Sequence, residues 1–282
     1  MKFAYLWILC SVVSCFPGNA TEVHFYSKMP PNWLSLPKPA NEALDKKLIR
    51  DILIHTKDMQ YQFHLVNHTK AAQLTLDNAH GCMAGVLSTP ERRKIFHYSQ
   101  PFTLVLGLRL YVLKNSRMQR RLQFLQDPQG KVSLQAAWLK NARVLLGLDA
   151  ERSYGAELDP LIRTPEKSKY LYLKQSGVGI GELWPMLLQQ RVDIILEYPF
   201  LLPETYKQQL HSFPVAEATH TTAAYFACNR GKVGAEIIAR LNTAIRSRVL
   251  TEHYLQLQLS EVELPEQAEY KKQYKELMSA AD

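Results

Sequence analysis

The chain has 282 residues, of which 46% are hydrophobic and 21% are charged, a balance that excludes a disordered protein. It carries 34 Lys and Arg against 26 Asp and Glu, a net charge of +8. The basic residues are spread along the chain apart from clusters at residues 92–94 and 117–121. We interpret them as a solvated basic surface and expect no nucleic-acid partner.

Residues 1–20 predict a secretory signal peptide. Lys2 is followed by an apolar run, and small residues at Gly18 and Ala20 suit cleavage before Thr21. The apolar run is too short to cross a bilayer as a helix, and no later segment is long enough. A second route stays open, because the residues that end at Cys15 have the shape of a lipobox and would lead to lipidation there. We expect an exported chain that is not embedded in a membrane.

Cysteine usage adds one expectation. Cys10 and Cys15 belong to the signal peptide, so Cys82 and Cys228 remain after cleavage. Two cysteines in an oxidising compartment are candidates for a disulfide, and a pair of buried free thiols is the alternative.

Strands and helices alternate through the first part of the chain. Residues 23–26 predict a short strand, which two prolines end just before Trp33. The elements that follow are a helix at 42–55, a strand at 60–66, a helix at 70–76 and a strand at 81–87. This alternation indicates an α/β lobe with a mainly parallel sheet.

A similar pattern starts again after a long apolar run at residues 104–113 and a basic stretch at 114–121. The elements expected next are a helix at 134–140, a strand at 142–146, a loop at 147–155, a strand at 170–174, a helix at 182–190, strands at 192–196 and 223–228, an amphipathic helix at 234–249 and a polar helix with few apolar anchors at 266–278. No flexible linker separates the two units, so we expect strands to join them.

The most informative segment runs from Gly81 to Phe102. A strand leads into a helix, with Thr89 as N-cap and Pro90 at the first helical position. Arg92 lies in the first helical turn, and its planar guanidinium suits a carboxylate held at two points. A surface arginine paired with Glu91 is the alternative.

This segment resembles the signature of the bacterial extracellular solute-binding proteins of family 3. In that family a Gly-rich strand is followed by Thr-Pro-Glu-Arg and then by an aromatic-Ser-x-Pro-aromatic stretch. Within the family, Cys82, the run Ser153-Tyr154-Gly155 and the pair Tyr198-Pro199 are most similar to a poorly characterised secreted branch.

The resemblance implies a two-lobed α/β fold of the type II periplasmic-binding-protein kind. Residues 21–110 and 224–282 would form one lobe and residues 111–223 the other. The runs at 104–113 and 223–228 would be the hinge strands.

The resemblance also implies a function. The protein would be a periplasmic monomer without enzymatic activity, cofactor or metal, and it would close around a small polar or anionic solute, either amino-acid-like or a carboxylate. An inner-membrane transporter or a sensor would recognise the closed form. Two alternatives stay open, a lyase-like enzyme on the same scaffold with Glu197 as its acid or base, and an envelope protein that binds no ligand.

Candidate binding residues follow from the same resemblance. Arg92, with Thr89, would hold an anionic group of the solute. Gly85 and Leu87 stand where relatives often have small hydroxyl residues, and Tyr198 stands where the acid for an α-ammonium group is expected. These departures favour a ligand other than an ordinary α-amino acid.

The second lobe and one loop supply the remaining candidates. Ser153 and Tyr154 would offer hydrogen-bond donors from the second lobe, and Glu197 would face the cleft beside them. Trp33 is a candidate for stacking on a flat or apolar part of the ligand, with a loop anchor as the alternative.

Overall fold

The computed structural model describes residues 20–37, 42–140, 143–150, 154–174, 183–260 and 262–280. The expected signal peptide up to residue 19, its lipidation alternative at Cys15, and Ser153 fall outside these residues. Across the ranges described, no helix combines the length and the apolar character needed to cross a membrane.

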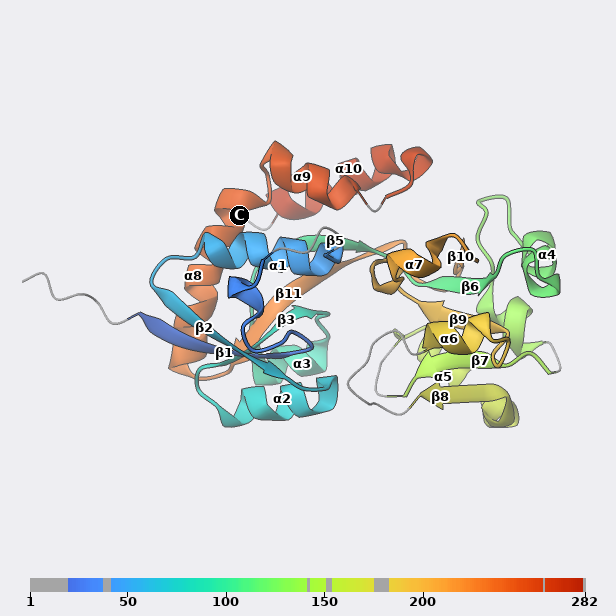
Figure 1. Ribbon diagram of the computed structural model, residues 1–282, viewed down its shortest axis with the longest axis horizontal. Coiled ribbons are helices and arrows are strands. Elements are labelled where there is room, and N and C mark those ends of the chain that lie inside the picture. Colours follow the sequence, from blue (N-terminus) through green and yellow to red (C-terminus); the bar gives the residue numbers. More distant parts are fainter. Residues whose placement is uncertain are drawn as a thin grey trace, which may run out of the picture.

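A six-stranded sheet forms the first lobe (lobe 1), at the left in Figure 1. Its order is β2-β1-β3-β11-β4, and β5 pairs with β11 away from this path. β1 is parallel to β2 and β3, whereas β11 is antiparallel to β3, β4 and β5. The strands are β1 (Thr21–Ser27), β2 (Met59–Leu65), β3 (Gly81–Val86), β4 (Phe96–Tyr98), β5 (Thr103–Leu106) and β11 (Thr221–Asn229).

Helices cover both faces of this sheet, because alternate side chains of a strand point to opposite faces. Val23 and Phe25 belong to a core shared with α1, α8, α9 and α10, and Tyr26 belongs to a smaller core shared with α2. The helices of lobe 1 are α1 (Leu44–Ile54), α2 (His68–Asp77), α3 (Pro90–Ile95), α8 (Lys232–Arg248), α9 (Glu252–Leu259) and α10 (Gln267–Ser279), with 3-10 turns η1 (Trp33–Ser35) and η5 (Leu264–Glu266).

A five-stranded sheet forms the second lobe (lobe 2), at the right in Figure 1, in the order β10-β6-β9-β7-β8. β7 is parallel to β8 and β9, and β6 is antiparallel to β9 and β10. The strands are β6 (Arg109–Leu113), β7 (Leu146–Asp149), β8 (Leu171–Lys174), β9 (Ile194–Glu197) and β10 (Leu210–Pro214). The helical elements are α4 (Arg117–Phe124), the π-helical turn η2 (Gln135–Leu139), α5 (Leu158–Ile162), η3 (Pro165–Tyr170), α6 (Leu183–Leu188), η4 (Pro199–Leu201) and α7 (Glu204–Lys207).

One element of lobe 2 differs from its expected position. The strand expected at 142–146 begins only at Leu146, as β7, and continues through Gly147 into the expected loop. Gly147 is buried, and a Cβ atom there would lie 3.4 Å from side-chain atoms of Ile195 and Val192. The glycine therefore permits close packing inside a strand and does not mark a loop.

Two links tie the N-terminal part of lobe 1 to its C-terminal part. A disulfide joins Cys82 of β3 to Cys228 of β11, which are cross-strand partners with a Cα separation of 4.0 Å. Arg248 of α8 donates to Asp51 of α1, with Nε 2.8 Å from Oδ2. Both links join segments that are far apart in the sequence.

The chain passes between the lobes twice, at residues 107–108 and at residues 215–220. The apolar run expected as one hinge strand is divided into β5 in lobe 1 and β6 in lobe 2. Both crossings therefore come a few residues before the expected boundaries at 110 and 223, and the second crossing precedes β11.

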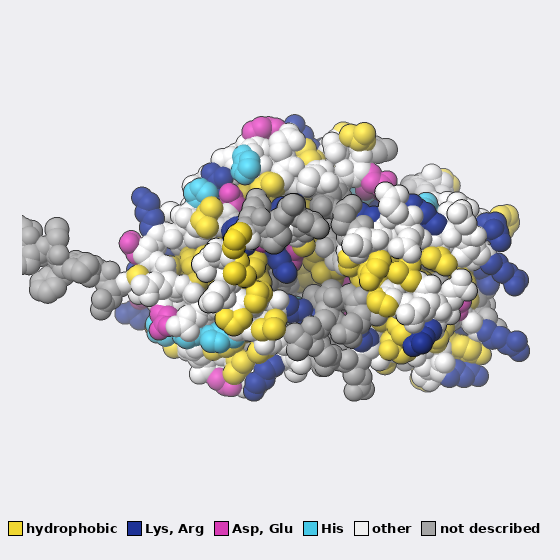
Figure 2. Space-filling model, viewed as in Figure 1, with side chains coloured by type: hydrophobic (Ala, Val, Ile, Leu, Met, Phe, Trp, Pro, Cys, Tyr) yellow, Lys and Arg dark blue, Asp and Glu magenta, His cyan; other side chains and the backbone are white. Residues whose placement is uncertain are grey.

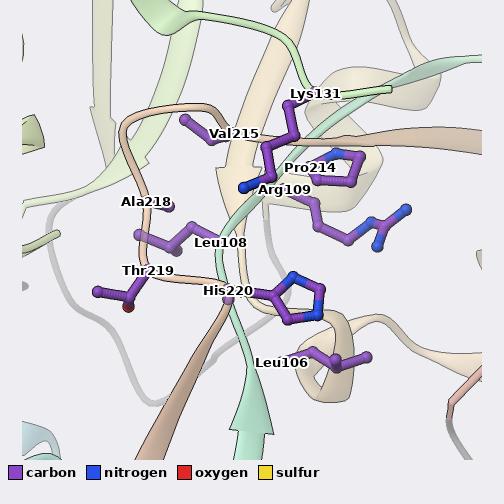
Figure 3. A pocket seen from close by; sticks show the side chains of 10 residues that line it. Leu106, Leu108, Arg109, Lys131, Pro214, Val215, Ala218, Thr219 and His220 are labelled. Atoms are coloured by element: carbon purple, nitrogen blue, oxygen red, sulfur yellow. The ribbon is translucent and has the colours of Figure 1, made fainter. Parts of the chain in front are cut away.

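Gly107 explains where the first crossing lies. Its N–H donates to the carbonyl of His220 at 2.7 Å, and a Cβ atom at Gly107 would lie 2.0 Å from the carbonyl oxygen of Thr219. The two crossings lie side by side around a cavity of only about 10 Å³, lined among others by Leu108 and Val215 (Figure 3). A side chain at Gly107 would force these two backbones apart.

The C-terminal helix α10 is better anchored than its polar sequence indicated. Tyr270, Tyr274 and Met278 are buried on one side of it. The hydroxyl of Tyr274 donates to the carbonyl of Val249 at 2.7 Å. Tyrosine rings thus supply the apolar contacts while their hydroxyls find partners inside lobe 1.

α10 and the residue before it contact the first residues of the strands that follow the two crossings. Thr221, just after the second crossing, donates to Gln273 at 2.9 Å. Arg109, just after the first crossing, forms an ion pair with Glu266 at the start of the helix, with Nη1 3.5 Å from Oε1. Arg109 belongs to lobe 2, so this ion pair links the two lobes.

Candidate functional site

A cavity of about 850 Å³ lies between the two lobes. Lobe 1 lines it with the end of β3, the start of α3 and one face of α1, and lobe 2 lines it with residues 154–157 and 198–201. Residues 217–219 of the second crossing line it too, as do residues 26–29 and 66–68, β5, and parts of β11, α9 and α10. Hydrophobic side chains border the junction from both lobes in Figure 2. A cavity of this size is typical of a site for a small molecule.

A bulge shapes the end of β3 at the cavity wall. Met83 pairs with Ala227 and Val86 with Tyr225, so β3 has one residue more than β11 between these pairs. Gly85 lies in the bulge with φ +70°, a conformation that favours glycine. Gly85 therefore has a backbone role at the position where relatives often have a hydroxyl side chain.

Thr89 caps α3 as the sequence predicted. Its Oγ1 accepts a hydrogen bond from the N–H of Arg92 at 3.3 Å, and Pro90 is the first helical residue. α3 has only six residues, and Thr89 already occupies one of its free N–H groups. Any anion held here would therefore depend mainly on the side chain of Arg92.

Arg92 is exposed and lines the cavity. Within the described ranges, no carboxylate forms an ion pair with its guanidinium. The pKa of the neighbouring Glu91 carboxyl is lowered, first by its own backbone N–H and then by the Thr89 side chain. The alternative of an Arg92–Glu91 surface pair is therefore absent from the structure.

Two tyrosines of lobe 2, and a leucine that lobe 1 extends toward them, form a further part of the wall. Tyr154 is held in place, because its hydroxyl accepts from the N–H of Asp149 and its own N–H donates to Asp159, both at 2.8 Å. Tyr198 stacks on Phe200 with ring centroids 5.6 Å apart. Leu87 extends from lobe 1 and packs against the core of lobe 2. All three of the predicted residues Leu87, Tyr154 and Tyr198 line the cavity.

Trp33 lies away from this wall. It is 4% exposed in the core of lobe 1, with its ring edge against Phe63 at 5.2 Å. Its Nε1 donates to Glu42 at 3.1 Å, and the guanidinium of Arg50 lies 4.5 Å from the ring centroid. The structure thus places Trp33 as the loop anchor that the sequence left as the alternative to ligand stacking.

Glu197 is also outside the described lining. It is 4% exposed at the end of β9, and its Oε1 accepts from the N–H of Tyr198 at 2.8 Å. Its strand partner in β6 is Arg109. The acid on which the enzyme alternative depended is thus buried inside lobe 2 instead of facing the cavity.

The wall also carries acids that sequence analysis did not single out. Asp45, in the first turn of α1, lines the cavity, and burial raises the pKa of its carboxyl. Glu217 lines it from the second crossing while accepting from the hydroxyl of Ser133 at 2.6 Å and the N–H of Leu134 at 2.9 Å. The cavity wall therefore carries cationic side chains at Arg92, Lys28 and Lys46, and carboxyl groups on other parts.

No sequence signal marked Asp45. Its helix was expected, but the side of α1 that meets the cavity depends on how lobe 2 is placed.

Histidines do not form an evident metal centre in the described segments, where no group of three or more His, Cys, Asp or Glu side chains is arranged to hold a metal ion. Nδ1 of His24 lies 2.9 Å from Nε2 of His64, on neighbouring strands β1 and β2. These two rings also stack, with centroids 5.2 Å apart.

Comparisons with known proteins give structural matches only. No protein-family model matches the chain, and no curated protein matches its sequence. An ancestral arginine-binding protein bound to arginine is 16% identical, with a TM-score of 0.58 over 87% of this chain and 99% of that one. A histidine kinase sensor domain with similarity to periplasmic binding proteins is 13% identical, with a TM-score of 0.59 over 86% and 97%.

A third match comes from a structural description of glutathione import via GshT and the cystine ABC importer TcyBC of Streptococcus mutans. It is 12% identical, with a TM-score of 0.60 over 86% of this chain and 94% of that one. At such low identities these likenesses show the fold alone. The chain has the two-lobed type II fold of periplasmic binding proteins, and this expectation from the sequence is confirmed.

Proposed function

We propose that this protein binds a small polar or anionic solute, amino-acid-like or a carboxylate, in the cavity between its lobes. The observation that carries the proposal is the position of Arg92. Arg92 lines an interlobe cavity of about 850 Å³, and its guanidinium has no carboxylate partner among the described residues. A guanidinium in such a position is well suited to hold a carboxylate with two hydrogen bonds.

Binding would be coupled to closure of the lobes. Arg92 and Leu87 reach the cavity from lobe 1, and Tyr154 and Tyr198 from lobe 2. A solute that contacts both sets stabilises the closed form relative to the open one, and the two crossings allow a hinge motion. The acids of the wall, Asp45 among them, would interact with a positive group of the solute if it has one.

We further propose membership of solute-binding protein family 3, export to the periplasm as a monomer, and no enzymatic activity. The Thr89 to Arg92 motif and the fold support the family, and the residues before Thr21 support export. A transporter or a sensor would be the partner. Proteins of this fold include both an arginine-binding protein and a kinase sensor domain, so the fold is compatible with either role.

Isothermal titration calorimetry against amino acids, small carboxylates and short peptides tests the proposal. For the solute that binds, Arg92→Ala should weaken affinity by about 10- to 100-fold, as expected for loss of a charged hydrogen-bond donor. Arg92→Lys should recover part of the loss, since it restores charge without the planar fork. Lys94→Ala is the matched control, because Lys94 lies on the same helix outside the described lining and should bind as the native protein does.

Three outcomes would contradict the proposal. They are a solute whose affinity does not change in Arg92→Ala, heat from product formation instead of saturable binding, and the absence of binding across the whole panel.

A further inference from the structure

Helix α4 carries a stripe of side chains that the proposed solute site does not use. Arg117, Arg120, Arg121 and Phe124 are spaced at i, i+3, i+4 and i+7, so they share one face of the helix. All four are exposed, and Phe124 is 90% exposed. Lys114, exposed three residues before the helix, adds a fourth cation to this segment. We call these five residues the basic stripe.

The opposite face of α4 is fixed to lobe 2. Leu122 is fully buried, and Met118 and Leu125 pack against the same core. Ser116 caps the helix by accepting from the N–H of Gln119 at 3.0 Å. The packing of this face holds α4 in place and leaves the basic stripe facing solvent.

The stripe lacks internal charge balance. In the described part of the chain, none of its cations forms an ion pair, and the first turn of α4 contains no acid. The nearby Asp127 is engaged by its own turn, where it accepts from the N–H groups of Gln129 and Lys131 at 2.9 and 2.8 Å. No described carboxylate thus neutralises the stripe.

The arrangement is unfavourable for the isolated helix. Arg117 and Arg120 lie in the first turn, where the helix dipole disfavours cations, and like charges at i, i+3 and i+4 repel. A solvated basic surface would not require this concentration of charge on two turns, nor a phenylalanine at its end. An external anionic surface would relieve the repulsion.

We propose that the basic stripe docks the protein on a membrane surface that contains anionic phospholipid. Arginines at the level of the headgroups and an aromatic ring at the boundary of the acyl chains are the combination that such a surface binds. The stripe is about 12 Å long and lies at the end of lobe 2 farthest from lobe 1 in Figure 1, where several Lys and Arg side chains gather in Figure 2. None of its residues lines the cavity, so docking would leave the solute site accessible.

Co-sedimentation with vesicles tests this proposal. The native protein should bind vesicles of equal parts phosphatidylglycerol and phosphatidylcholine, should bind phosphatidylcholine alone much less, and should lose binding as salt is added. Arg117→Gln, Arg120→Gln and Arg121→Gln together should weaken binding by about 100-fold, at roughly fivefold for each charge. Phe124→Ser should weaken it by about tenfold through lost apolar burial.

A control variant separates the stripe from net charge. Lys232→Gln, Arg246→Gln and Lys272→Gln remove the same charge from exposed positions of lobe 1. This triple variant should bind vesicles nearly as well as the native protein. Calorimetry with the solute should give native affinity for both triple variants, so failure of the docking proposal is distinguishable from failure of the solute site.

Several results would overturn the proposal. They are equal binding to neutral and anionic vesicles, no binding to anionic vesicles at low salt, and an equal loss in the stripe and control variants. Stripe-dependent binding to polyglutamate without any binding to vesicles would also overturn it, in favour of an acidic protein surface.

Discussion

Lobe 1 is assembled from both ends of the described chain, whereas lobe 2 is one continuous segment between the two crossings. In lobe 1, the Cys82–Cys228 disulfide and the Arg248–Asp51 ion pair hold the two chain segments together. In lobe 2, the sheet forms from strands within residues 109–214. Arg92, the proposed anion-binding residue, belongs to the lobe with the long-range links. We infer that lobe 1 holds the anion contact in place while lobe 2 closes over it.

Removing the disulfide should change the stability of lobe 1 relative to lobe 2 more than any other substitution considered. Cys82→Ala with Cys228→Ala opens a loop of 146 residues, and the free energy of unfolding of lobe 1 should fall by about 5 kcal/mol. The tryptophans after the expected cleavage site report the lobes separately, since Trp33 lies in lobe 1 and Trp138 and Trp184 lie in lobe 2.

Urea unfolding followed by fluorescence, in a Trp138→Phe/Trp184→Phe background and in a Trp33→Phe background, measures the two transitions. An equal loss of unfolding free energy in both lobes would contradict the expectation that the disulfide stabilises lobe 1 alone.

Trp33→Ala should have the next largest effect. It removes a buried ring from lobe 1 and leaves Glu42 and Arg50 without that contact, so unfolding should become about 4 kcal/mol easier. Far-UV circular dichroism in urea measures this loss, and Trp33→Phe should show a smaller one. Calorimetry below the melting temperature should give native solute affinity. If Trp33→Ala weakened solute binding but kept native stability, Trp33 would be a ligand-binding residue and not a loop anchor.

Gly107→Ala tests the hinge between the lobes. The added Cβ atom would meet the carbonyl oxygen of Thr219 at 2.0 Å, so the crossings must separate, at a cost of about 3 kcal/mol. Differential scanning calorimetry should show a lower melting temperature, and small-angle scattering should show a changed distance between the lobes. Native values in both measurements would mean that the crossings tolerate a side chain at this point.

Acid should weaken both lobes slightly. Burial, and then His24, lower the pKa of His64 in lobe 1, and burial, and then Lys114 and Arg109, lower the pKa of His211 in lobe 2. A histidine whose pKa is lowered in the folded state stabilises the fold at pH values above its ordinary pKa of 6.5. This stabilisation is lost as the pH falls from 6.5 toward the lower pKa of the folded state.

His64→Gln should therefore reduce the acid sensitivity of the Trp33 signal, and His211→Gln that of the Trp138 and Trp184 signals. Thermal melts between about pH 7 and about pH 5 measure both. Acid sensitivity that is unchanged in both variants would contradict this assignment.

The sequence predicted the backbone of the site well, because local signals define it. Thr89, Pro90 and Arg92 specify a capped helix start from their residue types alone, and the structure has it. The alternation of strands and helices likewise predicted two α/β units. Features that depend on neighbours along the chain were thus accessible to pattern reasoning.

Features that depend on tertiary packing were not. Gly147 looked like part of a loop because its packing against Ile195 comes from another strand. The apolar run at 104–113 gave no sign that the chain crosses between the lobes within it. The need for glycine at position 107 comes from the close approach of the Thr219 backbone, which is a tertiary contact. Trp33 and Glu197 were placed in the cleft because a sequence pattern does not reveal toward which core a side chain turns. Asp45 was missed for the same reason.

The distance between the lobes, measured by pulsed electron paramagnetic resonance, tests the central claim most directly. Spin labels at Glu236→Cys on α8 and Gln189→Cys after α6 occupy exposed positions of lobe 1 and lobe 2. The solute identified by calorimetry should shorten this distance in the native background and leave it unchanged, at the same concentration, in Arg92→Ala. A distance that does not change while the solute is bound would contradict closure around an anion held by Arg92.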